Sequence, residues 1–252
     1  MRKKVWLHSK RNDHRSLGMV EGQVIITGAS KGIGAGIAEE LHRRGYAVVN
    51  LSRSGEALVG ESLACDVADE SDVKVAVRKI ASQGPIIGLV NNAGLHINHS
   101  ASTVITEEFE RVMRLNTTAV MMMSREVYPY LKSTQGMVIN IGSFFDKLGV
   151  PENLAYCSSK AAVAAMTRVM AVEWAADGIS VINVAPGYIE TDMNRDYLNR
   201  EKVHTWMSQR IPVGRPGQVN EVARMVVAIF SENISFLTGE TIYIDGGHGI
   251  NH

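Results

Sequence analysis

Residues 23–34 read QVIITGASKGIG, a short apolar run that leads directly into a glycine-rich loop. The run at 23–27 is typical of a buried strand, and the stretch 35–44 after the loop predicts a helix. Glycines in such a loop let the backbone turn tightly and approach a ligand, while the free N–H groups at the helix N-terminus attract an anion such as a pyrophosphate. The order of strand, loop and helix therefore predicts a dinucleotide-binding unit.

The rest of the chain alternates short apolar runs with helical segments. Further helices are predicted at 69–82, 106–131, 156–177 and 218–231. Further strands are predicted at 46–51, 62–64, 88–90, 137–142, 179–185 and 241–244. Because such alternation produces parallel sheets covered by helices, we expect an α/β fold, a doubly wound Rossmann-type sheet of about seven strands with helices on both faces. With 252 residues, of which 45% are hydrophobic, the chain can bury this core as a single domain.

A second group of polar residues lies between positions 143 and 160. Tyr156 and Lys160 are four residues apart in a stretch of good helix formers, so they should share one helical face with the ammonium beneath the phenol. A neighbouring cation can supply much of the roughly three pKa units, or about 4 kcal/mol, needed to bring a phenol to neutrality. Ser143 follows the apolar run 137–142, so its hydroxyl should emerge where open α/β sheets bind ligands. A Tyr and a Lys at this spacing are usually only surface neighbours, and the pair gains weight from Ser143 and the glycine loop.

The order strand, Ser143, Tyr156, Lys160 and the loop spacing Thr-Gly-x-x-x-Gly-x-Gly resemble the short-chain dehydrogenase/reductase family. Residues 91–94, NNAG, and residues 186–191, PGYIET, extend the resemblance over nearly the whole chain from about residue 22. It implies hydride transfer between a nicotinamide cofactor and a small-molecule carbonyl compound or secondary alcohol.

The resemblance also implies roles for four catalytic residues, Asn116, Ser143, Tyr156 and Lys160. Tyr156 would exchange a proton with the substrate oxygen, which Ser143 would hold by a hydrogen bond. Lys160 would lower the phenol pKa and bond the nicotinamide ribose. Asn116 would kink the long helix and, through water, pass protons to Lys160. Asn91 would brace the central sheet through side-chain hydrogen bonds.

The implied cofactor contacts come from the glycine loop and the carboxyl ends of the neighbouring strands. Asp66 and Val67 would meet the adenine, Ala93 and Gly94 would pass the ribose, and the loop that begins at Pro186 would hold the carboxamide. The full expected set is Gly28, Ser30, Lys31, Gly32, Ile33, Gly34, Ser52, Arg53, Asp66, Val67, Asn92, Ala93, Gly94, Tyr156, Lys160, Pro186, Gly187, Ile189 and Thr191.

The residue after the second strand distinguishes NADP from NAD. A carboxylate there would bind the adenosine ribose hydroxyl and repel a 2′-phosphate, but this chain has Ser52 followed by Arg53. A guanidinium can fork onto a phosphate, and Lys31 adds a second cation, so NADP(H) is favoured over NAD(H). The alternative is that Arg53 is an ordinary exposed charge.

The substrate stays open at this point. Residues 188–215 mix polar, apolar and proline residues and are expected to form a mobile lid. The segments 186–193 and 214–217 resemble those of 3-oxoacyl-(acyl carrier protein) reductases, but Val172 and Asp177 occupy the places of the arginines that dock the carrier. A free ketone, a sugar or polyol, or a steroid-like compound therefore stays open too. The expected pocket residues are Phe144, Phe145, Val150, Tyr188, Met193 and Trp206.

One rival reading is a protein that binds NADPH and no longer catalyses. Such a sensor would typically lose Tyr156 or Lys160, and this chain has all four catalytic positions filled. A second rival, an epimerase or dehydratase on the same fold, usually needs a larger substrate domain.

Composition gives expectations about partners and location. The 26 Lys and Arg residues balance 26 Asp and Glu residues, and no run of 18 apolar residues occurs, so we expect neither a nucleic-acid nor a membrane partner. The eight histidines and two cysteines show no metal-binding spacing, and two thiols suit a reduced cytoplasm. Three consecutive methionines at 121–123 cannot all face one core, which with the resemblance favours a homotetramer or homodimer.

The first 18 residues differ from the remainder. Six basic residues and one acidic residue give this segment a charge of about +5. We expect it to be a disordered leader, followed by one domain over 19–252. Met19 could be the true start, or the leader could be an expression remnant or a basic arm.

Overall fold

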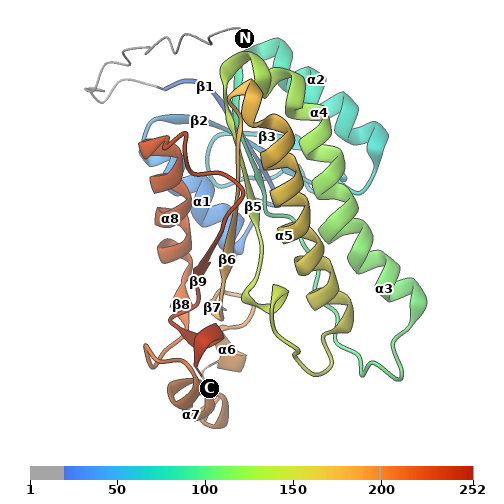
Figure 1. The fold of residues 1–252 in the computed structure, drawn as a ribbon, viewed down its shortest axis with the longest axis vertical. Coiled ribbons are helices and arrows are strands. Elements are labelled where there is room, and N and C mark those ends of the chain that lie inside the picture. Colours follow the sequence, from blue (N-terminus) through green and yellow to red (C-terminus); the bar gives the residue numbers. More distant parts are fainter. Residues whose placement is uncertain (1–19, 199, 252) are drawn as a thin grey trace, which may run out of the picture.

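Seven parallel strands form one continuous sheet in the computed structural model, which describes residues 20–198 and 200–251 (Figure 1). The strand order is β3-β2-β1-β4-β5-β6-β9. The strands are β1 Val20–Thr27, β2 Tyr46–Ser52, β3 Glu61–Ala64, β4 Ile86–Asn91, β5 Met137–Ile141, β6 Ser180–Pro186 and β9 Thr241–Ile244. The expected α/β fold with about seven strands is confirmed, and the expected leader at 1–18 lies outside the described residues.

Helices cover both faces of the sheet (Figure 1). On one face lie α1 Gly32–Arg43 and α8 Val219–Glu232. On the other face lie α2 Glu70–Gln83, α3 Thr106–Met113, α4 Ala119–Thr134 and α5 Leu154–Trp174. None of the helices at 20–198 and 200–251 is long and apolar enough to cross a lipid bilayer.

Each face of the sheet has its own hydrophobic core. Ile37 of α1 and Val226 of α8 pack against one face, and Ile80 of α2 and Met123 of α4 pack against the other. All five residues of β5 are buried, as expected for a strand covered on both sides. The apolar runs in the sequence are therefore a direct consequence of two-sided burial.

A series of hydrogen-bonded polar side chains, here called the polar chain, connects the sheet to the helices α4 and α5. The side-chain nitrogen of Asn91 donates to Asn140 Oδ1 at 2.9 Å and to Ser124 Oγ at 3.1 Å. Asn140 donates in turn to Thr167 Oγ1 at 2.9 Å. These bonds join β4 and β5 to α4 and α5, which confirms the expectation that Asn91 braces the sheet.

The side on which successive strands are added to the sheet changes between β1 and β4. From β1 it builds β2 and β3 on one side, and then it crosses to build β4, β5, β6 and β9 on the other. In parallel sheets, ligands bind outside the strand carboxyl ends at such a switch point. Figure 1 shows that these ends point toward the short helices α6 Arg195–Leu198 and α7 Glu201–Arg210.

Several local features differ from the sequence-based expectations. The long helix expected over 106–131 is interrupted by a π-helical turn at Arg114–Thr118, which lies between α3 and α4. The expected lid over 188–215 contains α6 and α7, and a two-stranded ladder forms between β7 Ile189–Glu190 and β8 Gly217–Gln218. These elements depend on contacts between distant segments, which a periodic pattern does not encode.

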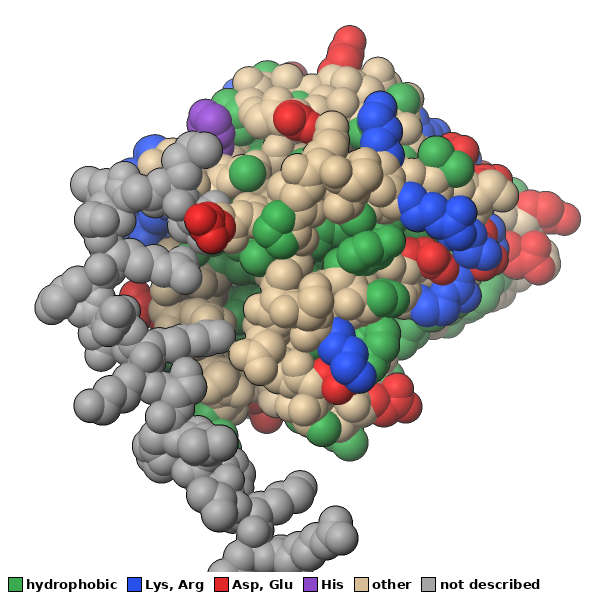
Figure 2. Space-filling model, turned by 90° about the horizontal axis from the view of Figure 1, so that it is seen from above, with side chains coloured by type: hydrophobic (Ala, Val, Ile, Leu, Met, Phe, Trp, Pro, Cys, Tyr) green, Lys and Arg blue, Asp and Glu red, His purple; other side chains and the backbone are tan. Residues whose placement is uncertain are grey.

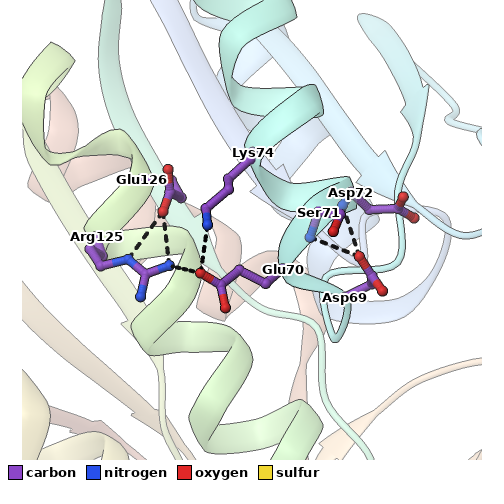
Figure 3. A network of polar contacts seen from close by, with 7 residues as sticks. All are labelled: Asp69, Glu70, Ser71, Asp72, Lys74, Arg125 and Glu126. Carbon is purple, nitrogen blue, oxygen red and sulfur yellow. Dashed lines mark hydrogen bonds and ion pairs between the residues drawn. The ribbon is translucent and has the colours of Figure 1, made fainter.

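Charged side chains of both signs are interspersed on the face opposite the strand carboxyl ends (Figure 2). Figure 3 shows one group between two helices, where Arg125 of α4 lies 2.7 Å from Glu70 of α2, which also pairs with Lys74 at 2.8 Å. Nearby, Asp69 caps α2 by accepting bonds from two backbone N–H groups. Exposed ion pairs contribute little to stability, so apolar burial and the polar chain hold these layers together.

We predict that the Asn140→Ala variant loses about 2–4 kcal/mol of unfolding free energy, because it opens a cavity and leaves buried polar partners unsatisfied. Urea unfolding at a fixed protein concentration measures this loss. The matched Arg125→Ala variant, which removes only exposed pairs, should leave the urea midpoint nearly unchanged. Equal midpoints for all three proteins would contradict a structural role for the polar chain.

Candidate active site

Two adjoining cavities open at the carboxyl edge of the sheet. The first, here called the Tyr156 cavity, has a volume of about 330 Å³ and is lined by Ser143, Tyr156 and Lys160. The second, the glycine-loop cavity, has a volume of about 510 Å³. Both are lined by Ile33, Asn92, Gly94, Leu95 and Thr191. The two cavities are therefore compartments of one elongated site.

Ser143 stands just after β5, where the strand delivers it to the Tyr156 cavity. Its side chain is only 6% exposed, and its hydroxyl accepts a bond from the Phe145 N–H at 3.2 Å. Its hydroxyl lowers the pKa of the Tyr156 phenol, which lies on α5 and lines the same cavity. The structure thus brings together two residues that are 13 positions apart in the sequence.

Tyr156 and Lys160 lie one turn apart on α5 and share a face, as the spacing predicts. The Lys160 Nζ lies 5.6 Å from the centre of the Tyr156 ring. It donates a hydrogen bond to the Ile141 carbonyl at 2.7 Å, so the helix is fastened to the end of β5. Burial lowers the pKa of Lys160 to about 8.

Burial is the largest influence on the Tyr156 phenol, and the expectation that Lys160 lowers the phenol pKa stays a prediction. Burial raises the pKa of Tyr156, and the hydrogen bond from Ser143 offsets only part of that rise. The Lys160 ammonium donates to the Ile141 carbonyl and lies 5.6 Å from the centre of the Tyr156 ring. Tyr156 therefore stays protonated and is placed to donate a proton.

Asn116 lies in the π-helical turn and lines neither cavity. It is 1% exposed, accepts a bond from the Leu95 N–H at 2.7 Å, and donates to the Leu95 carbonyl at 2.9 Å and to Ser159 Oγ at 3.0 Å. The long helix is interrupted here by the π-helical turn, and the Asn116 side chain ties the loop after β4 to α5. Its expected part in proton transfer stays a prediction.

The glycine loop leaves room for a cofactor backbone. At Gly28, with φ of +69°, an added Cβ would lie 2.9 Å from the Ala93 Cα, and at Gly34 it would lie 2.5 Å from the Gly28 carbonyl oxygen. At Gly32 the nearest atom would be 3.8 Å away, on Thr191, so this position faces open space. Gly28 and Gly34 permit close packing of the loops. Gly32 leaves a cradle above the N-terminus of α1 that fits a pyrophosphate.

Thr27 and Asn92 join the loops after β1 and β4. The Thr27 hydroxyl accepts bonds from the backbone N–H groups of Asn92 and Ala93, at 2.9 and 3.0 Å. The Asn92 side chain donates to the carbonyls of Thr27 and Gly28. Thr27 belongs to the loop motif, but its role in joining the loops follows only from the topology.

Every expected cofactor residue lines one of the two cavities. The glycine-loop cavity is lined by Gly28, Ser30, Lys31, Gly32, Ile33, Gly34, Ser52, Arg53, Asp66, Val67, Asn92, Ala93, Gly94 and Thr191. The Tyr156 cavity adds Tyr156, Lys160, Pro186, Gly187 and Ile189. Arg111 and Arg114 also line the glycine-loop cavity, and sequence reasoning missed both because exposed arginines on a helix carry no distinctive signal.

Arg53 and Lys31 supply positive charge to the glycine-loop cavity. Arg53 is exposed on the loop after β2, where Ser52 is buried against Ser54. Within residues 20–198 and 200–251, neither cation takes part in an ion pair. Both are therefore available to an anionic ligand. The same part of the chain contains no cluster of three or more side chains suited to a metal ion.

Aromatic rings form the outer wall of the Tyr156 cavity. Phe144, Phe145 and Tyr188 line it, as expected. Trp206 instead packs behind Tyr188, with 5.7 Å between ring centres. The expectation for two other residues is wrong, because Val150 lines neither cavity and Met193 lines the glycine-loop cavity.

Two histidines contact the aromatic residues of this wall. His96 lines the cavity and lies against Tyr156, with 4.4 Å between ring centres. His248 packs against Phe144 and Tyr188, and its buried Nδ1 has no hydrogen-bond partner. Burial lowers the pKa of His248, which favours the neutral ring. His96 closely follows the motif at 91–94, a place from which it could be expected to line the substrate mouth, whereas His248 belongs to no motif that would identify it from the sequence.

Comparison with known proteins places this geometry in a family. The family model described as enoyl-(acyl carrier protein) reductase matches residues 28–249. A 3-oxoacyl-(acyl carrier protein) reductase of Vibrio cholerae serotype O1 is 35% identical over 90% of this chain and 98% of its own length. A glucose 1-dehydrogenase of Gluconobacter oxydans is 34% identical over 89% of this chain and 91% of its own length.

A solved structure shows the same arrangement. The gluconate 5-dehydrogenase of Burkholderia cenocepacia, in complex with NADP and tartrate, superposes with a TM-score of 0.86 and 29% identity. The match covers 93% of this chain and 98% of that structure. With the family model, the relatives and the fold in agreement, the chain belongs to the short-chain dehydrogenase/reductase family of oxidoreductases, which act on alcohol and carbonyl groups.

Proposed function

We propose that this enzyme transfers a hydride between NADP(H) and a small carbonyl compound or secondary alcohol, with Ser143, Tyr156, Lys160 and Asn116 as its active site. The observation that carries the proposal is the convergence of Ser143, Tyr156 and Lys160 on one cavity that adjoins the glycine-loop cavity. A carbonyl oxygen placed between the Ser143 hydroxyl and the Tyr156 phenol would lie beside the compartment for the nicotinamide.

Tyr156 acts as the acid in the reductive direction. Bound NADPH supplies the hydride to the carbonyl carbon. Tyr156 donates its phenolic proton to the developing alkoxide, and Ser143 holds the same oxygen by a hydrogen bond. The raised pKa of Tyr156 keeps the phenol protonated before this step, and the nearby Lys160 ammonium and Ser143 hydroxyl stabilise the phenolate after it.

Asn116 positions the residues of this site without lining either cavity. Through Ser159 and the Leu95 backbone it fixes the helix that carries Tyr156 and Lys160 against the loop after β4. We place it on the route by which the phenolate regains its proton, by way of Lys160.

The preference for NADP over NAD rests on charge. Arg53 can fork onto a 2′-phosphate, Lys31 lies on the neighbouring glycine loop, and Ser52 introduces no carboxylate that would repel the phosphate. The related gluconate 5-dehydrogenase was crystallised with NADP. These observations support NADP(H) as the cofactor of this chain.

A free small carbonyl compound is the substrate class that we favour. Two of the compared relatives are named for sugars or sugar acids, and the carrier-docking face is weak because Val172 is 82% exposed and Glu173 is exposed beside it. Asp177 would repel an acidic carrier protein less than the sequence suggested, because its carboxylate pairs with Lys132 and accepts a hydrogen bond from Tyr128. Reduction of a 3-oxoacyl carrier thioester is therefore the second candidate, favoured by the name of the Vibrio relative.

Residues 188–215 would act as a lid over the substrate. Leu198, Met207 and Ile211 form a small apolar cluster with Tyr188, separate from the two cores beside the sheet. A segment with its own small core can open without disturbing the main cores. Tyr188 connects the lid to the cavity wall, so closure would exclude water from the reacting atoms.

We also propose a homotetramer or homodimer in the cytoplasm. Met122 and Met123 are buried in the core of one subunit, whereas Met121 is 39% exposed on α4. On α5, Val169 and Val172 are exposed apolar residues that a second subunit would cover. The free thiols of Cys65 and Cys157 suit a reducing compartment.

The Tyr156→Phe variant tests the acid. We expect turnover to fall at least about a thousandfold, because the ring stays in place and only the transferable proton is lost. NADPH affinity should be kept. Steady-state rates and fluorescence titration of NADPH measure both, and Tyr130→Phe, the same change on α4 outside either cavity, serves as the control. Substantial activity in Tyr156→Phe would remove Tyr156 as the acid.

The Arg53→Asp variant tests the cofactor preference. Loss of a charged hydrogen bond to the 2′-phosphate should weaken NADPH about ten- to a hundredfold and leave NADH affinity within about threefold. Arg78→Asp makes the same charge change on the exposed side of α2, away from both cavities, and should affect neither cofactor. Equal losses for NADPH and NADH would contradict the 2′-phosphate contact.

The Lys160→Met variant tests how much folding stability the protein loses by burying the Lys160 ammonium. The pKa of Lys160 falls to about 8 on folding, so at neutral pH the folded protein holds a charge that the unfolded chain accommodates more easily. We expect the inactive variant to be more stable than wild type at pH 7 by about 1–3 kcal/mol, with loss of the Ile141 hydrogen bond offsetting part of the gain.

The sign of the pH dependence gives a second readout. Between pH of about 8 and 10 the unfolded chain binds more protons at this lysine than the folded chain does, so wild-type stability should rise with pH at this site. Lys160→Met should lack that rise. Parallel stability curves for the two proteins over this range would contradict the lowered pKa.

A further inference from the structure

The imidazole of His96 lines the Tyr156 cavity but has no part in the chemistry proposed above. Its ring centre lies 4.4 Å from that of Tyr156, with 36° between the two planes. A substrate whose carbonyl oxygen meets the phenol would therefore place its neighbouring substituents close to His96.

Asn153 fixes which nitrogen of His96 carries a proton. Asn153 is 6% exposed, and its side-chain nitrogen donates to the Pro151 carbonyl at 2.7 Å. Its side-chain oxygen therefore faces Nε2 of His96, with which it forms a short hydrogen bond. Because an amide oxygen only accepts, Nε2 must be the donor, and Nδ1 of the neutral imidazole is then an acceptor.

That acceptor is not used by the protein. Nδ1 of His96 makes no hydrogen bond within the part of the chain that the structure describes. Asn194, another amide on the cavity wall, is engaged by the backbone, since its oxygen accepts from the Thr191 N–H and its nitrogen donates to the Ile189 carbonyl. His96 thus keeps an unused acceptor of defined tautomer on a residue that lines the cavity.

Backbone contacts also fix the position of His96 before a substrate binds. Its loop is joined to the segment before α5 by the bond from the His99 N–H to the Glu152 carbonyl at 2.9 Å and by a parallel bridge between His99 and Asn153. Asn153 directly precedes α5, the helix that carries Tyr156. The acceptor and the acid are therefore held by the same local structure, as a site that orients a substrate requires.

We propose that Nδ1 of His96 accepts a hydrogen bond from a hydroxyl group on the carbon next to the reacting carbonyl. The substrate would then be an α-hydroxy carbonyl compound, or the corresponding vicinal diol in the oxidative direction. This inference rests on the proposed function, because Tyr156 must hold the carbonyl oxygen. The hydroxyl itself is unchanged by the reaction, and only the carbonyl carbon gains the hydride and its oxygen the proton.

The test compares two ketones that differ by this hydroxyl, acetoin and butanone, with NADPH. Wild type should favour acetoin in kcat/KM by at least about tenfold, the discrimination expected of a site that bonds a substrate hydroxyl. His96→Phe keeps a ring beside Tyr156 and removes the acceptor, so the ratio should fall to about one through loss of acetoin turnover. His96→Gln returns an acceptor and should recover part of the ratio.

His99→Asn is the matched control, because His99 lies on the same loop and lines neither the Tyr156 cavity nor the glycine-loop cavity. It should keep the wild-type ratio. A wild-type ratio near one, or a ratio unchanged in His96→Phe, would overturn the role of His96 and leave the proposed function standing. No turnover of either ketone, nor of any other carbonyl compound with NADPH, would overturn the proposed function and this inference with it.

Discussion

A buried ammonium holds the catalytic end of this fold together. The Lys160 Nζ donates to the carbonyl of Ile141, the last residue of β5, and so fastens α5 to the strand that delivers Ser143. Tyr156, one turn earlier on the helix, lines the same cavity as Ser143. Burial lowers the pKa of Lys160 to about 8, which means that the folded state keeps the charge at a cost in stability. Such a cost is expected where a side chain is placed for chemistry rather than for packing.

The second half of the site depends on loops that approach each other closely. Thr27 and Asn92 join the glycine loop to the turn after β4, and Gly28 and Gly34 allow that approach because neither carries a Cβ. The cradle that remains faces the N-terminus of α1, where Lys31 is the N-cap residue, and Arg53 lines the same cavity. The glycine-loop cavity and the Tyr156 cavity thus meet along the edge of one sheet.

The sequence predicts the sheet and most of the site for a physical reason. Two-sided burial makes β1, β4 and β5 read as apolar runs, and the glycine loop and the spacing of Tyr156 and Lys160 are local features that a single stretch of chain encodes. The π-helical turn, the strand pair β7 and β8, and the contribution of Arg111 arise from contacts between distant segments. The raised pKa of Tyr156 likewise depends on how deeply the folded chain buries the phenol, which residue spacing alone does not give.

The measurement that tests the central claim most directly is NADPH oxidation by the wild-type protein, followed by absorbance, against thioesters, diketones, keto sugars and cyclic ketones, with NADH in parallel. The account predicts turnover of at least one class, with NADPH favoured over NADH. Tight binding of NADPH without turnover of any of these compounds would contradict a catalytic role for Tyr156 and would favour a protein that senses the cofactor.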